Sequence, residues 1–284
     1  MIKLKKPEDD VKVVFLDCIS NIKNSDLKEK LEHCTGEIIE IAEMFEKNMK
    51  IHEVHKIKKH NNVGGIVTKE EMKKVYNNKM VKSGQPGRKY YDKYITLARN
   101  GICPLCGQRE VSTLDHYLPK AKYPALAVTP SNLVPACREC NTTKSDKVFL
   151  SSIEETIHPY FDDIQNEVWL YSKIIEEDEI SFVFEVRRPE EWDELLYGRV
   201  KNHFKEFNLN KLYSTQAAVE FSGIRYRLMK VYNEVGNIGL KTHIRECYES
   251  YSIDCLNSWK SAMYRELSEN EWFYNNWIVY HANI

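Results

Sequence analysis

Two Cys-x-x-Cys pairs constrain this chain more than any other feature of its sequence. The pairs are Cys103 with Cys106 and Cys137 with Cys140. Each pair has the spacing of a zinc knuckle, and two knuckles complete the tetrahedral shell of four thiolates that structural zinc requires. We therefore predict a structural Zn²⁺ site. The other four cysteines lie outside such pairs, and we expect them to be small buried side chains.

Composition limits the classes of protein that the chain can belong to. It has 284 residues, of which 42% are hydrophobic and 29% are charged, as in a globular protein rather than a disordered one. The first residues contain no apolar signal segment, and no apolar run is long enough to span a bilayer. We therefore expect a cytoplasmic location without a membrane partner. In that reducing compartment, paired cysteines indicate a metal site rather than disulfides.

Charge is distributed unevenly along the chain, although the formal net charge is only −1. Residues 82–147 contain eleven Lys and Arg against five Asp and Glu, whereas residues 154–194 contain fourteen Asp and Glu against three Lys and Arg. A basic segment around the cysteine pairs suits contacts with nucleic-acid phosphates. The acidic segment would face away from nucleic acid or meet a basic partner. Two ordinary solvated surfaces would give the same pattern.

Apolar spacing predicts a mainly helical chain of the α+β class. Helical stripes run through residues 11–22 and 27–45, where apolar positions recur every three or four residues. Thr68 and Glu71 have the spacing of a capping box, which opens a short helix. The remaining elements that we predict are a basic, tyrosine-bearing helix over residues 88–99, a β-hairpin near 168–186, and further helices from 189 to about 277.

The residues between and beside the cysteine pairs have the chemistry for activating water at a phosphate. Asp115 and His116 end a β-prone run, and two asparagines, Asn132 and Asn141, follow later in the segment. A histidine can take a proton from water near neutral pH. The basic side chains that can contact neighbouring phosphates are Lys120, Lys122, Arg138 and Lys144, of which Lys144 lies one helical turn beyond Asn141.

The order strand, loop, strand, helix over residues 101–147 resembles the HNH (ββα-metal) endonucleases, in their zinc-containing, Asn-terminated variant. The resemblance implies that His116 is the general base and that Asp115 is a metal ligand. It also implies that Asn132 bonds across the loop and holds the imidazole. Asn141 stands where the third family histidine would be, and its amide oxygen, with the Asp115 carboxylate, suits Mg²⁺ or Mn²⁺.

The resemblance places a zinc-braced ββα-metal unit in the middle of the chain, with helical lobes around it. Metal binding can supply folding free energy to a unit with so little core of its own. The parts that we predict are a helical N-terminal region (1–95), an HNH nuclease unit with the zinc site (96–150), and a hairpin plus helical C-terminal region (151–284).

The chain is also similar in pattern to stand-alone bacterial HNH proteins found beside defence ATPases, such as Septu-type systems. That resemblance implies a DNA-cleaving effector of anti-phage defence with an ATPase partner subunit. Three alternatives stay open. A non-catalytic zinc module that binds nucleic acid or a protein partner needs only the cysteines and the basic segment. The same fold can cleave RNA, and a nuclease subunit can be held inactive until its ATPase partner engages it.

Overall fold

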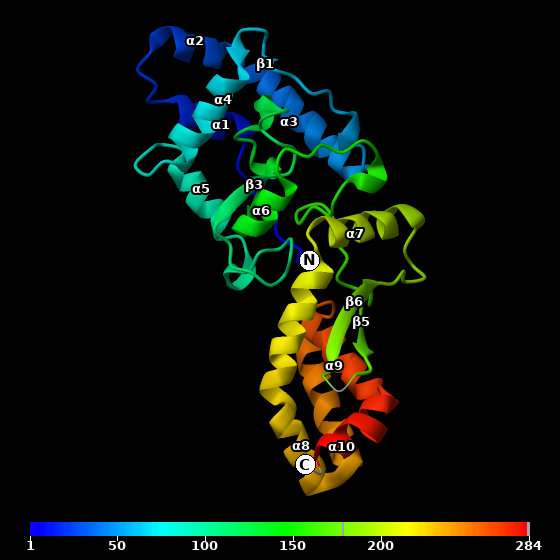
Figure 1. Ribbon diagram of the computed structural model, residues 1–284. Coiled ribbons are helices and arrows are strands. Elements are labelled where there is room, and N and C mark those ends of the chain that lie inside the picture. The colour runs from blue at the N-terminus through cyan, green and yellow to red at the C-terminus, as the bar shows by residue number, and fades with distance from the viewer. Residues whose placement is uncertain (178, 283–284) are drawn as a thin grey trace. The chain divides into compact units, whose positions relative to one another are not determined.

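The computed structural model describes residues 1–177 and 179–282 and divides into two compact units, residues 1–163 and 164–284 (Figure 1). The chain is mainly helical, and the strands among its described residues form three separate two-stranded antiparallel sheets. This confirms the predicted class. In the part of the chain that is described, no helix is both long enough and apolar enough to cross a membrane.

The first unit begins with five helices. They are α1 (Val11–Ile19), α2 (Ser25–His33), α3 (Thr35–Lys50), α4 (Lys69–Val75) and α5 (Arg88–Ile95). The side chain of Asp10 caps α1 by accepting a hydrogen bond from the Val13 amide. Thr68 and Glu71 form the predicted capping box of α4. Local side-chain chemistry therefore sets where α1 and α4 begin.

The stripe over residues 27–45 belongs to two helices rather than to the one helix that its spacing suggests. The chain bends at Cys34, where α2 ends and α3 begins. Leu31, Cys34 and Ile38 all stay buried across the bend, which is why the apolar pattern continues through it. A small hairpin, β1 (Asn62–Val63) and β2 (Val67–Thr68), follows α3 in a stretch whose sequence carries no strand signal.

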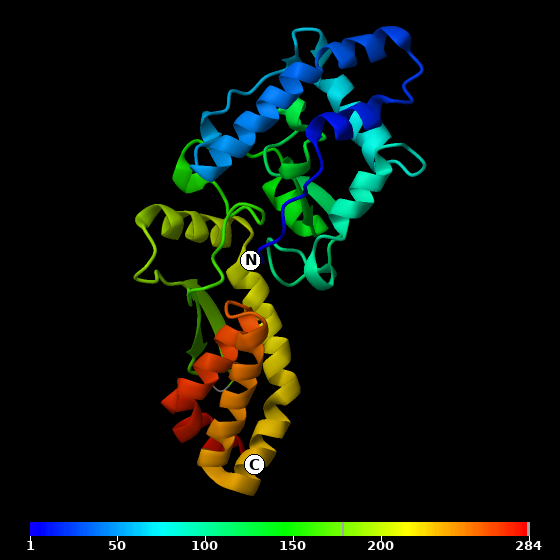
Figure 2. The same cartoon turned by 180° about the vertical axis from the view of Figure 1, so that it is seen from behind.

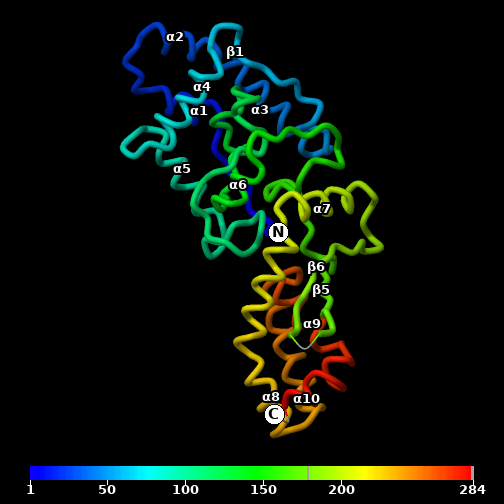
Figure 3. Tube along the Cα trace, in the orientation of Figure 1, coloured from blue at the N-terminus to red at the C-terminus, as the bar shows by residue number. Residues whose placement is uncertain are grey.

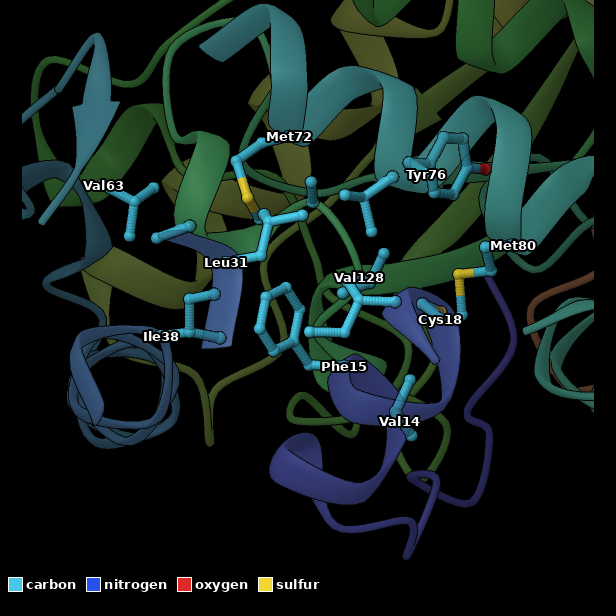
Figure 4. Close-up of a cluster of buried hydrophobic side chains, with 14 of the residues drawn as sticks. Val14, Phe15, Cys18, Leu31, Ile38, Val63, Met72, Tyr76, Met80 and Val128 are labelled. Atoms are coloured by element: carbon cyan, nitrogen blue, oxygen red, sulfur yellow. The ribbon is translucent and has the colours of Figure 1, made fainter. Parts of the chain in front are cut away.

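The helices share one hydrophobic core with residues 101–147, the central segment of the chain. Figure 4 shows Phe15 of α1 in the same cluster as Met72 of α4 and Val128 of the central segment. Leu114, which lies between the cysteine pairs, belongs to the same cluster. In Figures 1 and 2, helices α1 to α5 lie above and beside β3 and α6. The helical region and the central segment therefore fold together.

The central segment is a ββα element. Strands β3 (Thr113–His116) and β4 (Leu133–Ala136) pair antiparallel, with Asp115 opposite Val134. A long loop with two 3₁₀ turns, η4 (Pro124–Leu126) and η5 (Pro130–Asn132), joins them. Helix α6 (Arg138–Lys144) follows β4 and packs against β3. This is the predicted order of strand, loop, strand and helix.

The chain after α6 packs back onto the ββα element. The Tyr160 hydroxyl donates a hydrogen bond to the Leu133 carbonyl at 2.8 Å, and the Tyr117 hydroxyl donates to the Thr156 carbonyl at 2.6 Å. Both tyrosines are buried. These contacts explain why the first unit extends to Asp163.

The second unit combines a hairpin with helices. Its elements are β5 (Leu170–Ile175), β6 (Ser181–Val186), α7 (Glu194–Glu206), α8 (Leu209–Asp254), α9 (Trp259–Glu269), the π-helical turn η7 (Phe273–Trp277) and α10 (Ile278–Ala282). The hairpin confirms the prediction for residues 168–186, although Asp178 in its predicted turn lies outside the described residues. Within α8, Gly236 has φ 69° and ψ −173°, a conformation open almost only to glycine. The trace of α8 turns back on itself in Figure 3.

Candidate functional site

The two cysteine pairs meet in one buried cluster. The four Sγ atoms lie within 4.8 Å of one another, and no disulfide joins these four cysteines. A tetrahedral zinc ion with Zn–S bonds of about 2.3 Å holds its sulfur ligands roughly 3.8 Å apart. The cluster therefore fits a structural zinc ion, as the sequence predicts.

Each knuckle has a distinct backbone shape. In the first, the amide of Gly107 donates to the Cys103 carbonyl at 2.7 Å, and Gly107 has a φ of +63° that favours glycine. In the second, Cys137 is the N-cap of α6, and its sulfur accepts a hydrogen bond from the Cys140 amide at 3.4 Å. Helix α6 thus starts directly from the cysteine cluster.

The thiols influence one another's ionisation. The pKa of Cys106 is lowered, and the main cause is its hydrogen bond with Cys103. The pKa of Cys140 is raised, and the main cause is again the hydrogen bond with Cys103. A thiolate at one of these cysteines therefore makes ionisation of its neighbour less favourable. Four thiolates in this small buried space need a cation to balance their charge.

His116 ends β3 and is buried, with 5% of its surface exposed. Its Nε2 lies 2.8 Å from the carbonyl oxygen of Ala127. Because a carbonyl oxygen can only accept a hydrogen bond, Nε2 carries a hydrogen, and in the neutral ring Nδ1 keeps its lone pair. Burial, followed by the charge of Lys120, lowers the pKa of this imidazole well below its usual value. The geometry therefore makes Nδ1 the basic atom of the ring in its neutral form.

Asp115 and Lys144 form a buried ion pair beside this histidine. The Lys144 ammonium lies 3.1 Å from Oδ1 and 2.9 Å from Oδ2 of Asp115, and it also donates to the His116 carbonyl. The two side chains are only 5% and 3% exposed. The lysine that the sequence predicts as a phosphate contact is thus engaged with the predicted metal ligand.

The oxygen donors near the ion pair suit a hard divalent cation. Asn141 lies on α6 one turn before Lys144, so the two residues share a helix face. An amide oxygen and the Asp115 carboxylate are the donor types that Mg²⁺ and Mn²⁺ prefer. A cation at Asp115 would share the carboxylate with the Lys144 ammonium or take one oxygen from it.

Asn132 closes the loop between the two strands. Its side chain is fully buried, accepts a hydrogen bond from the Leu118 amide at 2.8 Å, and donates to the carbonyls of Leu118 at 3.0 Å and Leu126 at 3.1 Å. The next residue, Ala127, bonds the His116 ring. Asn132 therefore acts across the loop, and the imidazole itself is held by a backbone carbonyl.

The other predicted phosphate contacts lie in different surroundings. Lys120 is partly buried, and its ammonium lies 4.9 Å from the centre of the Tyr76 ring. Lys122 and Arg138 are exposed. Burial lowers the pKa of the Lys120 ammonium, and the charge of Asp115 opposes that shift.

Two groups at the site escape prediction from the sequence. Tyr76 lies edge-to-face against the His116 ring, with 4.4 Å between the ring centres. No local pattern connects a tyrosine after α4 with a histidine on β3. The sequence does not single out the Ala127 carbonyl either, because every residue has a backbone carbonyl.

The buried pair leads to a prediction about stability. Lys144→Ala is expected to lower the free energy of unfolding by about 3–5 kcal/mol, because it leaves the Asp115 carboxylate buried without its partner. Added Mg²⁺ or Mn²⁺ should restore part of the loss, since a cation bound only in the folded state stabilises it. Thermal melts of the zinc-loaded chain with and without divalent cation measure both effects.

Two variants control this experiment. Arg138→Ala changes an exposed basic residue on the same helix and should alter stability by less than about 0.5 kcal/mol. The double variant Asp115→Asn with Lys144→Met removes both charges and should be more stable than Lys144→Ala alone. Equal melting temperatures for Lys144→Ala and Arg138→Ala would contradict a stabilising role of the pair.

Comparisons with known proteins identify the same segment. A family model described as HNH endonuclease matches residues 103–147. The chain is similar to protein ea31 of Escherichia phage lambda, with 30% identity over 226 residues, which cover 75% of this chain and 76% of ea31. It is also similar to the Septu protein PtuB of Bacillus thuringiensis, with 28% identity over 100 residues, 34% of this chain and 38% of PtuB. No solved structure matches the chain.

Proposed function

Because this chain belongs to the family of phage lambda protein ea31 and carries an HNH endonuclease domain, we propose that it is a metal-dependent endonuclease that hydrolyses phosphodiester bonds in DNA. One observation carries the proposal. The hydrogen bond from Nε2 of His116 to the Ala127 carbonyl leaves Nδ1 as the proton acceptor of the neutral ring. This ring stands next to a buried carboxylate, Asp115, inside the segment that the HNH family model matches.

In this proposal, different residues take different parts in the hydrolysis. Nδ1 of His116 accepts a proton from a water molecule as that water's oxygen forms a bond to phosphorus. The bond from phosphorus to the leaving 3′ oxygen breaks, and that oxygen takes up a proton from solvent. Asn132 and the Ala127 carbonyl keep the loop and the imidazole in place during this step.

We further propose that Asp115 and Asn141 hold one Mg²⁺ or Mn²⁺, beside the structural zinc of the cysteine cluster. When bound, such a cation supplies positive charge for the phosphorane and for the leaving oxygen. The Lys144 ammonium beside Asp115 adds a second positive charge at the same place. The proposed contacts to neighbouring phosphates are Lys120, Lys122 and Arg138. Of these, Lys122 and Arg138 are exposed, so their side chains can reach a nucleic-acid backbone.

The test is a panel of substrates and metals. Zinc-loaded protein is incubated with supercoiled plasmid, single-stranded DNA and RNA, each with Mg²⁺, Mn²⁺ or a chelator of divalent cations. We expect plasmid nicking that appears with Mg²⁺ or Mn²⁺ and stops with the chelator, while RNA stays intact. Cleavage of RNA alone would instead support the RNA-cutting alternative. Tight binding without cleavage of any substrate would support the non-catalytic zinc module.

The finer biological role is also a proposal. The similarity to a Septu protein supports a nuclease effector of anti-phage defence that works in the cytoplasm with an ATPase partner subunit. The similarity spans 100 residues, 34% of this chain and 38% of PtuB, so the role of the whole chain needs its own test. A plaque assay on cells that carry the gene with and without its neighbouring ATPase gene tests this role. Protection that needs both genes and is lost in His116→Ala would support it.

A further inference from the structure

Tyr76 belongs to the helical region but lies at the proposed nuclease site. It starts the π-helical turn η2 (Tyr76–Val81), which directly follows α4. Figure 4 shows its ring at the edge of the apolar cluster, beside Met80 and away from Ile38. The side chain is buried, with 5% of its surface exposed. Short π-helical turns inside or after α-helices occur often at functional sites.

The Tyr76 ring restrains the imidazole of His116. The two ring centres are 4.4 Å apart and the planes are inclined by 72°, an edge-to-face pair. The hydrogen bond from Nε2 to Ala127 holds one corner of the imidazole, and by itself it leaves rotation of the ring about that bond open. A second ring packed against the imidazole limits this rotation. It therefore limits where Nδ1 can point.

The same tyrosine ring also contacts the charged end of a lysine side chain. The Lys120 ammonium lies 4.9 Å from its centre, within the range of a cation–π contact. The ring thus joins the proposed base and a proposed phosphate contact. The Tyr76 hydroxyl contributes little to this arrangement, because its hydrogen bond to the Leu114 carbonyl is long, at 3.5 Å.

We propose that Tyr76 is a positioning residue of the nuclease site, whose ring sets both the orientation of His116 and the place of the Lys120 ammonium. This inference rests on the proposed function. It means that the helical N-terminal region completes the catalytic unit. A ββα segment cut out of this chain would lack the ring, although its own metal ligands would all be present.

Three variants separate a positioning role from ordinary core packing. Tyr76→Phe keeps the ring and both ring contacts, whereas Tyr76→Leu removes them. Tyr90→Leu is the matched control. Tyr90 is also buried and also has a lysine over its ring, since the Lys89 ammonium lies 4.9 Å from its centre, but the ring that it packs against is Tyr94 and not a histidine. Tyr76→Met replaces Tyr76→Leu if the leucine variant does not fold.

The first readout needs no activity. In the full chain with labelled histidines, the ring-proton resonances of His116 are assigned by their absence in His116→Asn. We expect the nuclear Overhauser effects between these ring protons and Ala127 to change in Tyr76→Leu, because the imidazole turns, and to match the parent's in Tyr76→Phe and Tyr90→Leu. Overhauser effects of the His116 ring that stay unchanged in Tyr76→Leu would overturn the proposal, whatever shift the missing ring itself causes.

The second readout is single-turnover nicking of plasmid DNA. We expect Tyr76→Leu to lose a factor of roughly 10 to 100 in rate, since a small misplacement of a reacting group costs about that much. Tyr76→Phe should stay within about twofold of the parent, and so should Tyr90→Leu. Lys120→Ala should cost less in the Tyr76→Leu background than in the parent, because the two residues act together.

Equal rate losses in Tyr76→Leu and Tyr90→Leu would show general damage to the core and overturn the proposal. A Tyr76→Phe variant as slow as Tyr76→Leu would also overturn it, since the ring would then not be the active feature. The Overhauser measurement reports the orientation of His116 even if the parent cleaves no nucleic acid. Failure of this inference and failure of the proposed function are therefore distinguishable.

Discussion

His116→Ala is expected to reduce plasmid nicking by a factor of about 10² to 10⁴, the usual contribution of a positioned general base. The loss should appear in the rate of the chemical step, while affinity for DNA stays near that of the parent. The reason is geometric. His116 is buried and bonded to Ala127 through Nε2, so its contribution is a proton acceptor at Nδ1 and not a surface charge that attracts DNA. Single-turnover nicking and a DNA-binding titration measure the two quantities separately.

Two further variants make this result specific. His116→Asn retains an amide that can donate a hydrogen bond near Ala127 but provides no base, and it should be as inactive as His116→Ala. His33→Ala changes an exposed histidine of α2 and should nick DNA like the parent. A His116→Ala protein that nicks at the parent's rate in Mg²⁺ and Mn²⁺ would exclude catalysis by this residue.

Loss of the zinc site is expected to have the largest effect on folding. Cys106→Ser should reduce the bound zinc from one ion per chain to nearly none and abolish nicking. Structural zinc contributes roughly 10–16 kcal/mol of binding free energy in small zinc-finger peptides. Cys137 caps α6, and α6 carries Lys144, which contacts Asp115 on β3. Without zinc, β3 and α6 should therefore lose their relative positions.

Metal analysis and limited proteolysis of the full chain test this expectation. In Cys106→Ser, protease should cut within residues 1–163 first, while the second unit, which contains none of the four cluster cysteines, stays protected. Cys255→Ser is the matched control, because Cys255 lies in the second unit. Normal zinc content together with normal nicking in Cys106→Ser would contradict a structural zinc at the cluster.

Much of the fold was accessible from the sequence because its signals are local. A capping box needs only Thr68 and Glu71, and both are used as predicted. The apolar stripe of residues 27–45 was accessible too, but its break at Cys34 was not. The reason is that Leu31 and Ile38 face the core on either side of the break, so the spacing alone does not reveal it.

At the site, too, the sequence predicts the local features but not the contacts between distant residues. The spacing of the cysteines predicts that four sulfur atoms meet, and they do, within 4.8 Å. The spacing of Lys144 from Asn141 predicts a shared helix face, but it says nothing of Asp115. The buried pair between Lys144 and Asp115 appears only when α6 packs on β3. Roles for these residues in catalysis stay predictions until the variants are measured.

By itself, the sequence determined which segment forms the cysteine cluster and the ββα element of the HNH domain, because knuckle spacing, strand, loop and helix signals all act between residues close along the chain. Only the tertiary structure decided which atoms surround the imidazole of His116. The Ala127 carbonyl and the Tyr76 ring reach it through loop closure and helix packing. These depend on contacts between residues far apart in the chain, and no local pattern records such contacts.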